Sequence, residues 1–111
     1  MFKLPDSVTE LGHRAFWGCR SLTSINLPSN LTKLGDGAFV ICSGLESLTI
    51  NSNIDEVNEA FYGCDNLTSV IIPEDLAKSG IIEKLIAAGI KAETIKKTSP
   101  SITVFITNTR K

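Results

Sequence analysis

Three phenylalanines, Phe16, Phe39 and Phe61, lie 23 and 22 residues apart, and most of their neighbours recur at the same interval. A fixed period of about 20–50 residues is typical of repeat architectures, in which each unit packs on the next unit. The spacing therefore indicates a stack of similar coils rather than a globule with a single irregular core.

The repeat divides the chain into units at residues 4–26, 27–49 and 50–71, and a fourth unit begins at Ile72 and departs from the pattern. Eight positions are apolar or small in every copy, and mostly Ser, Thr, Asn, Asp, Glu, Lys and Gly stand between them. In the first unit these positions are Leu4, Val8, Leu11, Ala15, Phe16, Cys19, Leu22 and Ile25. One unit of this length cannot bury its own apolar side, so we expect each position to stack on its copy in the next coil.

Apolar and polar residues alternate around Ile25, Leu48 and Val70, which predicts strands with one solvated face in a parallel ladder. Because proline lacks the N–H that a ladder needs, we expect Pro5, Pro28 and Pro73 to end strands. A second short extended piece is predicted at residues 8–11 and its copies. The Ala-Phe-x-x-Cys piece is predicted to be a short helical turn that places the ring in the core.

The segment LPDSVTELGHRAFWGCRSLTSINLP and its two following copies resemble the BspA-like leucine-rich repeats, over roughly residues 4–73. The resemblance implies an α/β repeat fold, a short leucine-rich-repeat solenoid with a parallel strand ladder. Members of that family are mostly found on or outside bacterial cells. Two positions depart from the pattern. Asn51 stands where the other units have proline, and Asn58 replaces the glycine, so we expect different local geometry there.

The period stops after Pro73, and we interpret residues 74–111 as a C-terminal cap on the stack. A helix is predicted at about residues 75–88, with Asp75 as its N-cap and Gly89 just past its end. Because Gly80 weakens a helix interior, a helix that starts at Ser79 is the alternative. Two strands, at about residues 90–97 and 102–108, are predicted to form a β-hairpin.

Composition excludes several classes of function. The net charge is −1, so general attraction to nucleic acid is not expected. No apolar run approaches the length of about 18 residues that a membrane helix requires, so no membrane insertion is expected. Met1 to Lys3 lead directly into the first repeat, so we expect no signal peptide in this chain.

The search for reactive groups predicts neither an enzyme nor a cofactor or metal site. Cys19, Cys42 and Cys64 are spaced as the repeat is, without a close pair of ligands, so we expect a column of buried thiols. His13 has Asp36 at the equivalent position of the next unit, but no nucleophile is arranged with them. Catalytic residues are therefore predicted to be absent.

Two surfaces are candidates for partner binding. The first is the solvated face of the strands, and the second is a patch on the outer turns, where side chains of the types that dominate binding energy occur. The strand-face candidates are Ser24, Asn26, Ser47, Thr49, Ser69 and Ile71, and the outer-turn candidates are Arg14, Trp17, Arg20 and Tyr62.

We therefore expect a non-catalytic protein–protein interaction module with a protein partner. The family resemblance implies a cell-surface or secreted location and adhesion to host or matrix proteins. The alternative is a structural spacer, or a fragment of a longer repeat protein, with no ligand of its own. The first coil has no cover before it, so either upstream repeats pack on it or it pairs with another molecule, such as a second copy in a homodimer.

Overall fold

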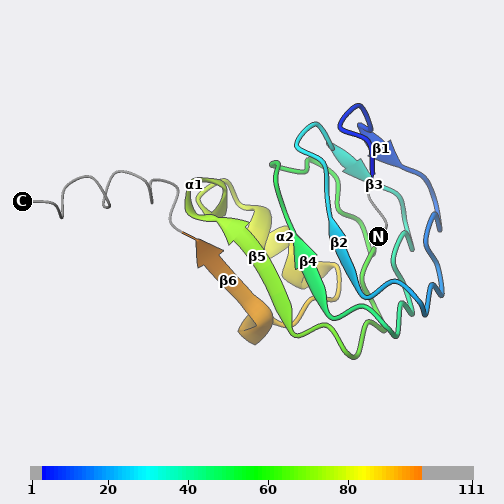
Figure 1. Ribbon diagram of the computed structural model, residues 1–111. Helices are drawn as coiled ribbons and strands as arrows, with labels where there is room; N and C mark the ends of the chain where they lie inside the picture. Colours follow the sequence, from blue (N-terminus) through cyan, green and yellow to red (C-terminus); the bar gives the residue numbers. More distant parts are fainter. Residues whose placement is uncertain (1–3, 99–111) are drawn as a thin grey trace, which may run out of the picture.

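The computed structural model describes residues 4–98, which form stacked coils joined by a parallel strand ladder (Figure 1). Four strands lie side by side in the order β2, β4, β5, β6, and every neighbouring pair is parallel. Their register joins Ile25 to Leu48 and Leu48 to Val70, which confirms the predicted ladder. The strands are β2 Ser24–Asn26, β4 Ser47–Thr49, β5 Ser69–Pro73 and β6 Ile95–Thr98.

A second, shorter ladder lies at another side of the coils. Here β1 (Glu10–Leu11) pairs in parallel with β3 (Lys33–Leu34), and Lys33 forms a further parallel bridge with Glu56 of the third coil. The second extended piece predicted at residues 8–11 is therefore present, but its strand is shorter than expected. Lys33 also lies 3.8 Å from the carboxylates of both Glu10 and Glu56, so charges alternate along this ladder.

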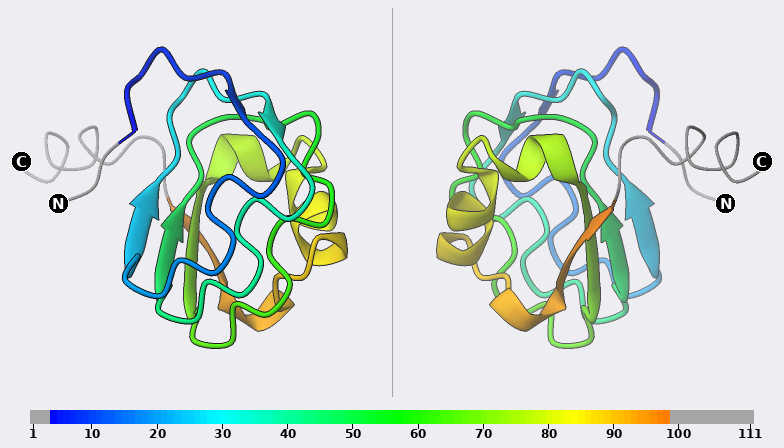
Figure 2. Two further views of the ribbon diagram at one scale, coloured as in Figure 1. Left: turned by 90° about the vertical axis from the view of Figure 1, so that its right-hand side faces the viewer. Right: turned by 90° about the vertical axis from the view of Figure 1, so that its left-hand side faces the viewer.

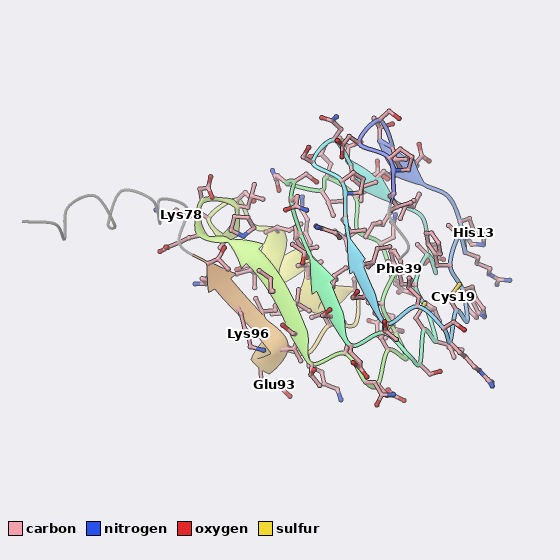
Figure 3. All side chains as sticks on the ribbon, in the orientation of Figure 1. His13, Cys19, Phe39, Lys78, Glu93 and Lys96 are labelled. Atoms are coloured by element: carbon pink, nitrogen blue, oxygen red, sulfur yellow. The ribbon has the colours of Figure 1, made fainter. Side chains whose placement is uncertain are left out.

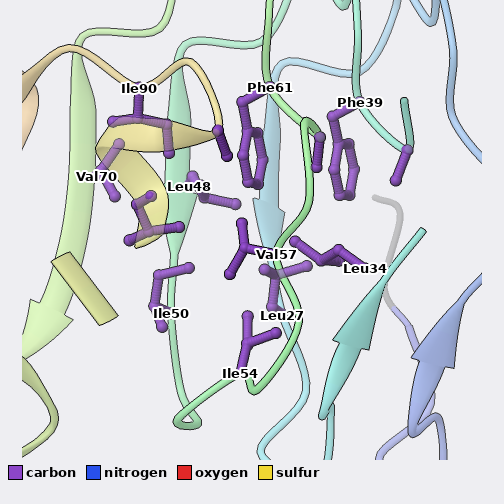
Figure 4. Packing of buried hydrophobic residues seen from close by; sticks show 14 of the residues in the cluster. Leu27, Leu34, Phe39, Leu48, Ile50, Ile54, Val57, Phe61, Val70 and Ile90 are labelled. Atoms are coloured by element: carbon purple, nitrogen blue, oxygen red, sulfur yellow. The ribbon is translucent and has the colours of Figure 1, made fainter. Parts of the chain in front are cut away.

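The repeated phenylalanines form a continuous stack, of which Figure 4 shows Phe39 and Phe61 in the core. The ring centroids of Phe16 and Phe39, and of Phe39 and Phe61, are 5.3 Å apart, and the rings are nearly parallel. Because each coil is close to a translated copy of the last, equivalent rings meet face to face. The buried cluster extends on either side of this stack, from Leu4 to Ile90.

The outer turns correct one prediction, because the Ala-Phe-x-x-Cys pieces are not helical. Their N–H groups alternate between a turn bond and a bond to the next coil. Phe16 donates to the Ala38 carbonyl at 2.7 Å, whereas Cys19 donates to the Phe16 carbonyl at 3.2 Å. Left-handed backbone at Gly18 and its copies also prevents a helix from continuing.

The predicted helix at residues 75–88 is interrupted. It consists of α1 (Glu74–Ala77) and α2 (Ile81–Ala87), separated around Gly80, whose φ is 91°. Asp75 is not the N-cap, because Pro73 occupies that position before α1. A glycine in the left-handed conformation cannot continue a right-handed helix, which is why the two pieces separate.

The end of α2 agrees with the sequence. Gly89 has a φ of 113°, and its N–H donates to the Ile86 carbonyl, while the N–H of Ile90 donates to the Leu85 carbonyl. This pair of bonds is the Schellman arrangement, so Gly89 ends the helix as predicted.

The segment after β5 continues the stack as a divergent coil. Phe61 donates to the Ala88 carbonyl at 3.0 Å, as Phe39 donates to that of Ala60. A 3₁₀ turn, η1 (Ala92–Thr94), leads into β6, which pairs in parallel with β5. The strand predicted at residues 90–97 therefore extends the ladder; its predicted hairpin partner at residues 102–108 lies outside the described residues. Figure 2 shows α2 on the side of the coils away from the four strands.

Both departures from the repeat pattern have distinct local structure. Asn51, in place of proline, donates from its side-chain amide to the Leu27 carbonyl at 2.7 Å. Asn58 has a φ of 53°, and its amide donates to the Leu34 carbonyl at 2.6 Å. The expectation of altered geometry is confirmed at Asn58, since its copies Gly12 and Gly35 do not have positive φ, and both amides tie the third coil to the second.

Candidate functional site

The most exposed apolar side chains gather where the chain turns outward after each core phenylalanine. Trp17, Ile41 and Tyr62 are 44%, 47% and 47% exposed, respectively. They come from three successive coils, and the N–H of Ile41 donates to the Tyr62 carbonyl. We call this surface the outer edge and define it by Arg14, Trp17, Val40, Ile41 and Tyr62.

Trp17 is held across two coils. A Cβ added to Gly37 would lie 2.9 Å from ring carbon Cζ3 of Trp17, so the indole packs directly on the second coil. The guanidinium carbon of Arg14 lies 4.7 Å from the centroid of the Trp17 ring, which is a cation–π distance. The Trp17 indole is therefore held between the backbone of the second coil and the Arg14 guanidinium of its own coil.

Tyr62 joins the outer edge to the divergent fourth coil. Its hydroxyl donates to the carbonyl of Ala87 in α2 at 2.9 Å. The fourth large exposed apolar residue among those described, Ile86, directly precedes Ala87. The hydrogen bond orients the tyrosine while nearly half of its surface stays in solvent.

A hollow of about 320 Å³ lies between these rings. It contains two carboxylates, and no ion pair in residues 4–98 involves either of them, because the salt bridges found there belong to Lys33. The lining residues are His13, Arg14, Trp17, Asp36, Gly37, Val40, Glu59 and Tyr62.

Two residues of the outer edge have unfavourable backbone conformations. Arg14 has a φ of 57° and Ile41 a φ of 58°. Equivalent positions in neighbouring coils hold glycine, namely Gly37 for Arg14 and Gly18 and Gly63 for Ile41, all with positive φ. Such conformations cost about 1–3 kcal/mol each for residues other than glycine and cluster at functional sites. Ile41 was not among the predicted site residues, although its alignment with two glycines could have identified it.

The structure brings together three of the four outer-turn candidates. Arg14, Trp17 and Tyr62 line one hollow, whereas Arg20 lies elsewhere. It borders a separate hollow of about 410 Å³ on the first coil, lined by Phe16, Cys19, Arg20, Ser21 and Leu22.

The strand face is a separate surface with different chemistry. Ser24, Ser47 and Ser69 are in register along the ladder, and so are Asn26, Thr49 and Ile71. Ile71 also pairs with Lys96 of β6 and is half-buried. In Figure 3, Lys96 on this ladder and His13 on the outer turns lie at opposite ends of the molecule.

The cysteines form a column inside the turns. Cys42 is buried and donates from its thiol to the Phe16 carbonyl at 2.9 Å, and Cys64 does the same to the Phe39 carbonyl at 3.0 Å. Cys19 and Cys64 are half-buried, which corrects the expectation that all three are buried. The hydrogen bond with the Cys42 side chain, followed by burial, raises the pKa of Cys64, and burial raises the pKa of Cys19.

Residues 4–98 contain no group of three or more His, Cys, Asp or Glu side chains that could hold a metal ion. His13 and Asp36 border the same hollow, but no ion pair joins them in this part of the chain. Among the helices described, none is long and apolar enough to cross a membrane.

Comparison with known proteins agrees with the stacked coils. Residues 1–103 match the family model of the BspA type leucine rich repeat region (6 copies). No match was found among the curated proteins or among the solved structures. The match covers most of the chain, and the parallel ladders recur at the repeat interval, so the protein has an α/β repeat fold. The chain belongs to the BspA-type leucine-rich repeat family.

Proposed function

We propose that this chain is a non-catalytic protein-interaction module that contacts its partner through the outer edge. The observation that carries the proposal is the gathering of Trp17, Ile41 and Tyr62 on one surface, each more than two-fifths exposed. Protein interfaces derive most of their binding energy from a few such side chains, and Trp, Tyr and Arg are the commonest among them.

The strand face supports binding less well. Its residues are small and polar apart from Ile71, so it offers little apolar area to a partner. Main-chain groups of β4 and β5 are paired with neighbouring strands on both sides, which leaves recognition to short side chains. We therefore propose the outer edge, rather than the strand face, as the primary contact.

Family membership supports a proposal about where the protein acts and what it binds. We propose that the coils form a leucine-rich-repeat solenoid on the cell surface or in the secreted fraction, where adhesion to host or matrix proteins would be its role. The competing proposal is a structural spacer, or part of a longer repeat protein, that binds nothing itself. A spacer requires the stacked core but has no need for exposed aromatic rings.

The test compares Trp17→Ala with Ser47→Ala on a panel of immobilised extracellular matrix proteins. A binder loses at least about tenfold in affinity with Trp17→Ala and little with Ser47→Ala, because the indole is the larger contact. Unfolding midpoints of both variants show whether either loss comes from the fold. Absence of binding across the panel by the unmodified chain would favour the spacer.

A second candidate contact is the face of the first coil, where we propose that a second copy of the chain packs to form a homodimer. The hollow of about 410 Å³ beside Arg20 and Leu22 lies on this coil, and β2 has a strand on one side only within residues 4–98. Light scattering over a range of concentrations tests it. The proposal predicts a dimer that Val8→Asp dissociates, and a monomer at every concentration would contradict it.

A further inference from the structure

The charge and shape of the hollow on the outer edge indicate what kind of partner it suits. We propose that it receives a lysine or arginine side chain of the partner protein, flanked by apolar residues that pack on Trp17, Val40 and Ile41. This inference rests on the proposed function and adds the chemistry of the partner.

The acidic groups of the hollow are the first reason to expect a cation there. Asp36 and Glu59 line the hollow from the second and third coils, and no ion pair within residues 4–98 neutralises them. Lys33, the basic residue nearest to Asp36 in the sequence, is instead shared between Glu10 and Glu56. The Arg14 guanidinium also lines the hollow, so an incoming ammonium or guanidinium group would meet two carboxylates against one fixed cation.

The negative charge of the coils around the hollow also favours a basic partner. Residues 1–73 carry 8 acidic and 4 basic side chains, a net charge of −4. Residues 74–111 carry 4 acidic and 7 basic side chains, a net charge of +3, so the negative charge belongs to the coils. Such a field accelerates the approach of a basic partner and repels an acidic one. The carboxylates in the hollow then provide the short-range contacts.

The aromatic rings that border the hollow are the second reason to expect a cation there. Arg14 already stacks on Trp17, which shows that this surface accommodates a guanidinium over an aromatic face. The Tyr62 ring is 47% exposed and is held by its hydroxyl, and it borders the same hollow as both carboxylates. A partner cation placed there gains a cation–π contact with Tyr62 together with ion pairs to Asp36 and Glu59.

The strained backbone of the outer edge is the third observation that supports a contact surface. Arg14 and Ile41 keep left-handed conformations where neighbouring coils use glycine, and both belong to the outer edge. The side chain of Arg14 lies on Trp17, and that of Ile41 is about half exposed and lies against Gly63. The equivalent glycines show that the turn itself requires a positive φ, so side chains at these two positions cost stability without filling the core, and such positions cluster at functional sites.

An acidic partner fits less well. The Arg14 guanidinium is the fixed cation that lines the hollow, whereas two carboxylates line the same space. A carboxylate that approached Arg14 would be repelled by Asp36 and Glu59. The balance of charge therefore favours a cation as occupant.

The chain has a single tryptophan, and it lies in this site, so its fluorescence reports binding directly. The probe is the peptide N-acetyl-Leu-Lys-Leu-amide, titrated at low salt, with N-acetyl-Leu-Glu-Leu-amide as its charge-reversed counterpart. We expect a saturable change with the lysine peptide that weakens as salt is added, and no saturation with the glutamate peptide.

Two double variants test whether the lysine peptide binds in the hollow. Asp36→Asn/Glu59→Gln removes both carboxylates from the hollow, while Asp6→Asn/Glu46→Gln removes two exposed carboxylates that do not line it. We expect the first pair to weaken the lysine peptide at least about tenfold and the second pair to change its affinity by less than about threefold. Equal losses in both pairs would show only general attraction to negative charge and would overturn the proposal, as would tighter binding of the glutamate peptide.

Failure of this inference differs from failure of the proposed function. If a matrix protein binds in a manner that depends on Trp17 but not on Asp36 and Glu59, the outer edge is the contact and the basic partner is wrong. If neither peptide alters Trp17 fluorescence and no immobilised matrix protein binds the chain, both proposals fail together.

Discussion

Two columns that are adjacent in the sequence behave in opposite ways. Phe16, Phe39 and Phe61 are identical in every coil and stack in the core, while the residues after them, Trp17, Val40 and Tyr62, differ in every coil. Both columns belong to turns with the same pattern of bonds between coils. The repeated backbone therefore specifies the fold. Core columns vary only among apolar residues, as at Ile25, Leu48 and Val70, whereas the exposed column after each phenylalanine varies in size and chemistry.

The difference shows where to look for function in such a chain. A residue that must pack on its own copy is constrained in every coil, so it carries little information about a partner. A residue on the outer edge has no copy to match. Departures there, including Ile41 in place of glycine, are the positions where a partner can be recognised.

The largest effect is expected in the phenylalanine column. Phe39→Ala should lower the free energy of unfolding by about 3–5 kcal/mol, because Phe39 is fully buried between two rings and its loss leaves a cavity. Phe16→Ala should cost less, since that ring is only half-buried. Urea denaturation of both variants measures the difference, and equal losses would argue against a first coil that is more open than the second.

The next effect concerns the glycine that links the two columns. Gly37→Ala should lower the free energy of unfolding by about 1–3 kcal/mol, because φ is 75° and the new Cβ would meet the Trp17 ring. It should also change Trp17 fluorescence. Gly12→Ala is the control, since no atom lies within 4 Å of a Cβ there. An unchanged spectrum in Gly37→Ala would mean that Trp17 does not lie on the second coil.

A smaller effect of opposite sign is expected at Ile41. Ile41→Gly should raise the free energy of unfolding by about 1 kcal/mol, because relief of the left-handed strain exceeds the entropy that glycine adds to the unfolded chain. Val40→Gly, one residue earlier in the same turn, should lower it. Thermal unfolding of both distinguishes them, and destabilisation by Ile41→Gly would remove the argument from strain.

The smallest expected effect concerns the thiols, and it is a difference in their rates of reaction with a reagent. Cys19 should react with a thiol reagent faster than Cys42 in the native protein, because the reagent reaches the half-buried Cys19 but not the fully buried Cys42, and this difference in access outweighs the raised pKa of Cys19. Mass spectrometry after brief labelling identifies the modified residue. Rapid labelling of Cys42 without denaturant would contradict the packed column.

The sequence predicts the ladder well, because Ile25, Leu48 and Val70 occupy one column and the structure places them in register. It predicts local backbone less well. The outer turns look helical by composition, yet bonds to neighbouring coils replace helical ones. The break at Gly80 depends on its left-handed conformation, which composition alone does not fix.

The candidate site is predictable only in part. Exposed aromatic side chains identified Trp17 and Tyr62, but sequence spacing could not separate Arg20 from them, because the turn carries it to a different hollow. Asp36 and Glu59 become neighbours of the rings only once the coils stack. Their role as a group is therefore a property of the fold rather than of any single unit.

The most direct test of the account is to map backbone amide chemical shifts as N-acetyl-Leu-Lys-Leu-amide is added. The outer edge and the strand face lie on different parts of each coil, so perturbed amides separate the two. We predict shifts at residues 13–18, 36–41 and 59–63, with β2, β4 and β5 unchanged. Shifts confined to those three strands, or absent throughout, would contradict the claim that the outer edge is the binding surface.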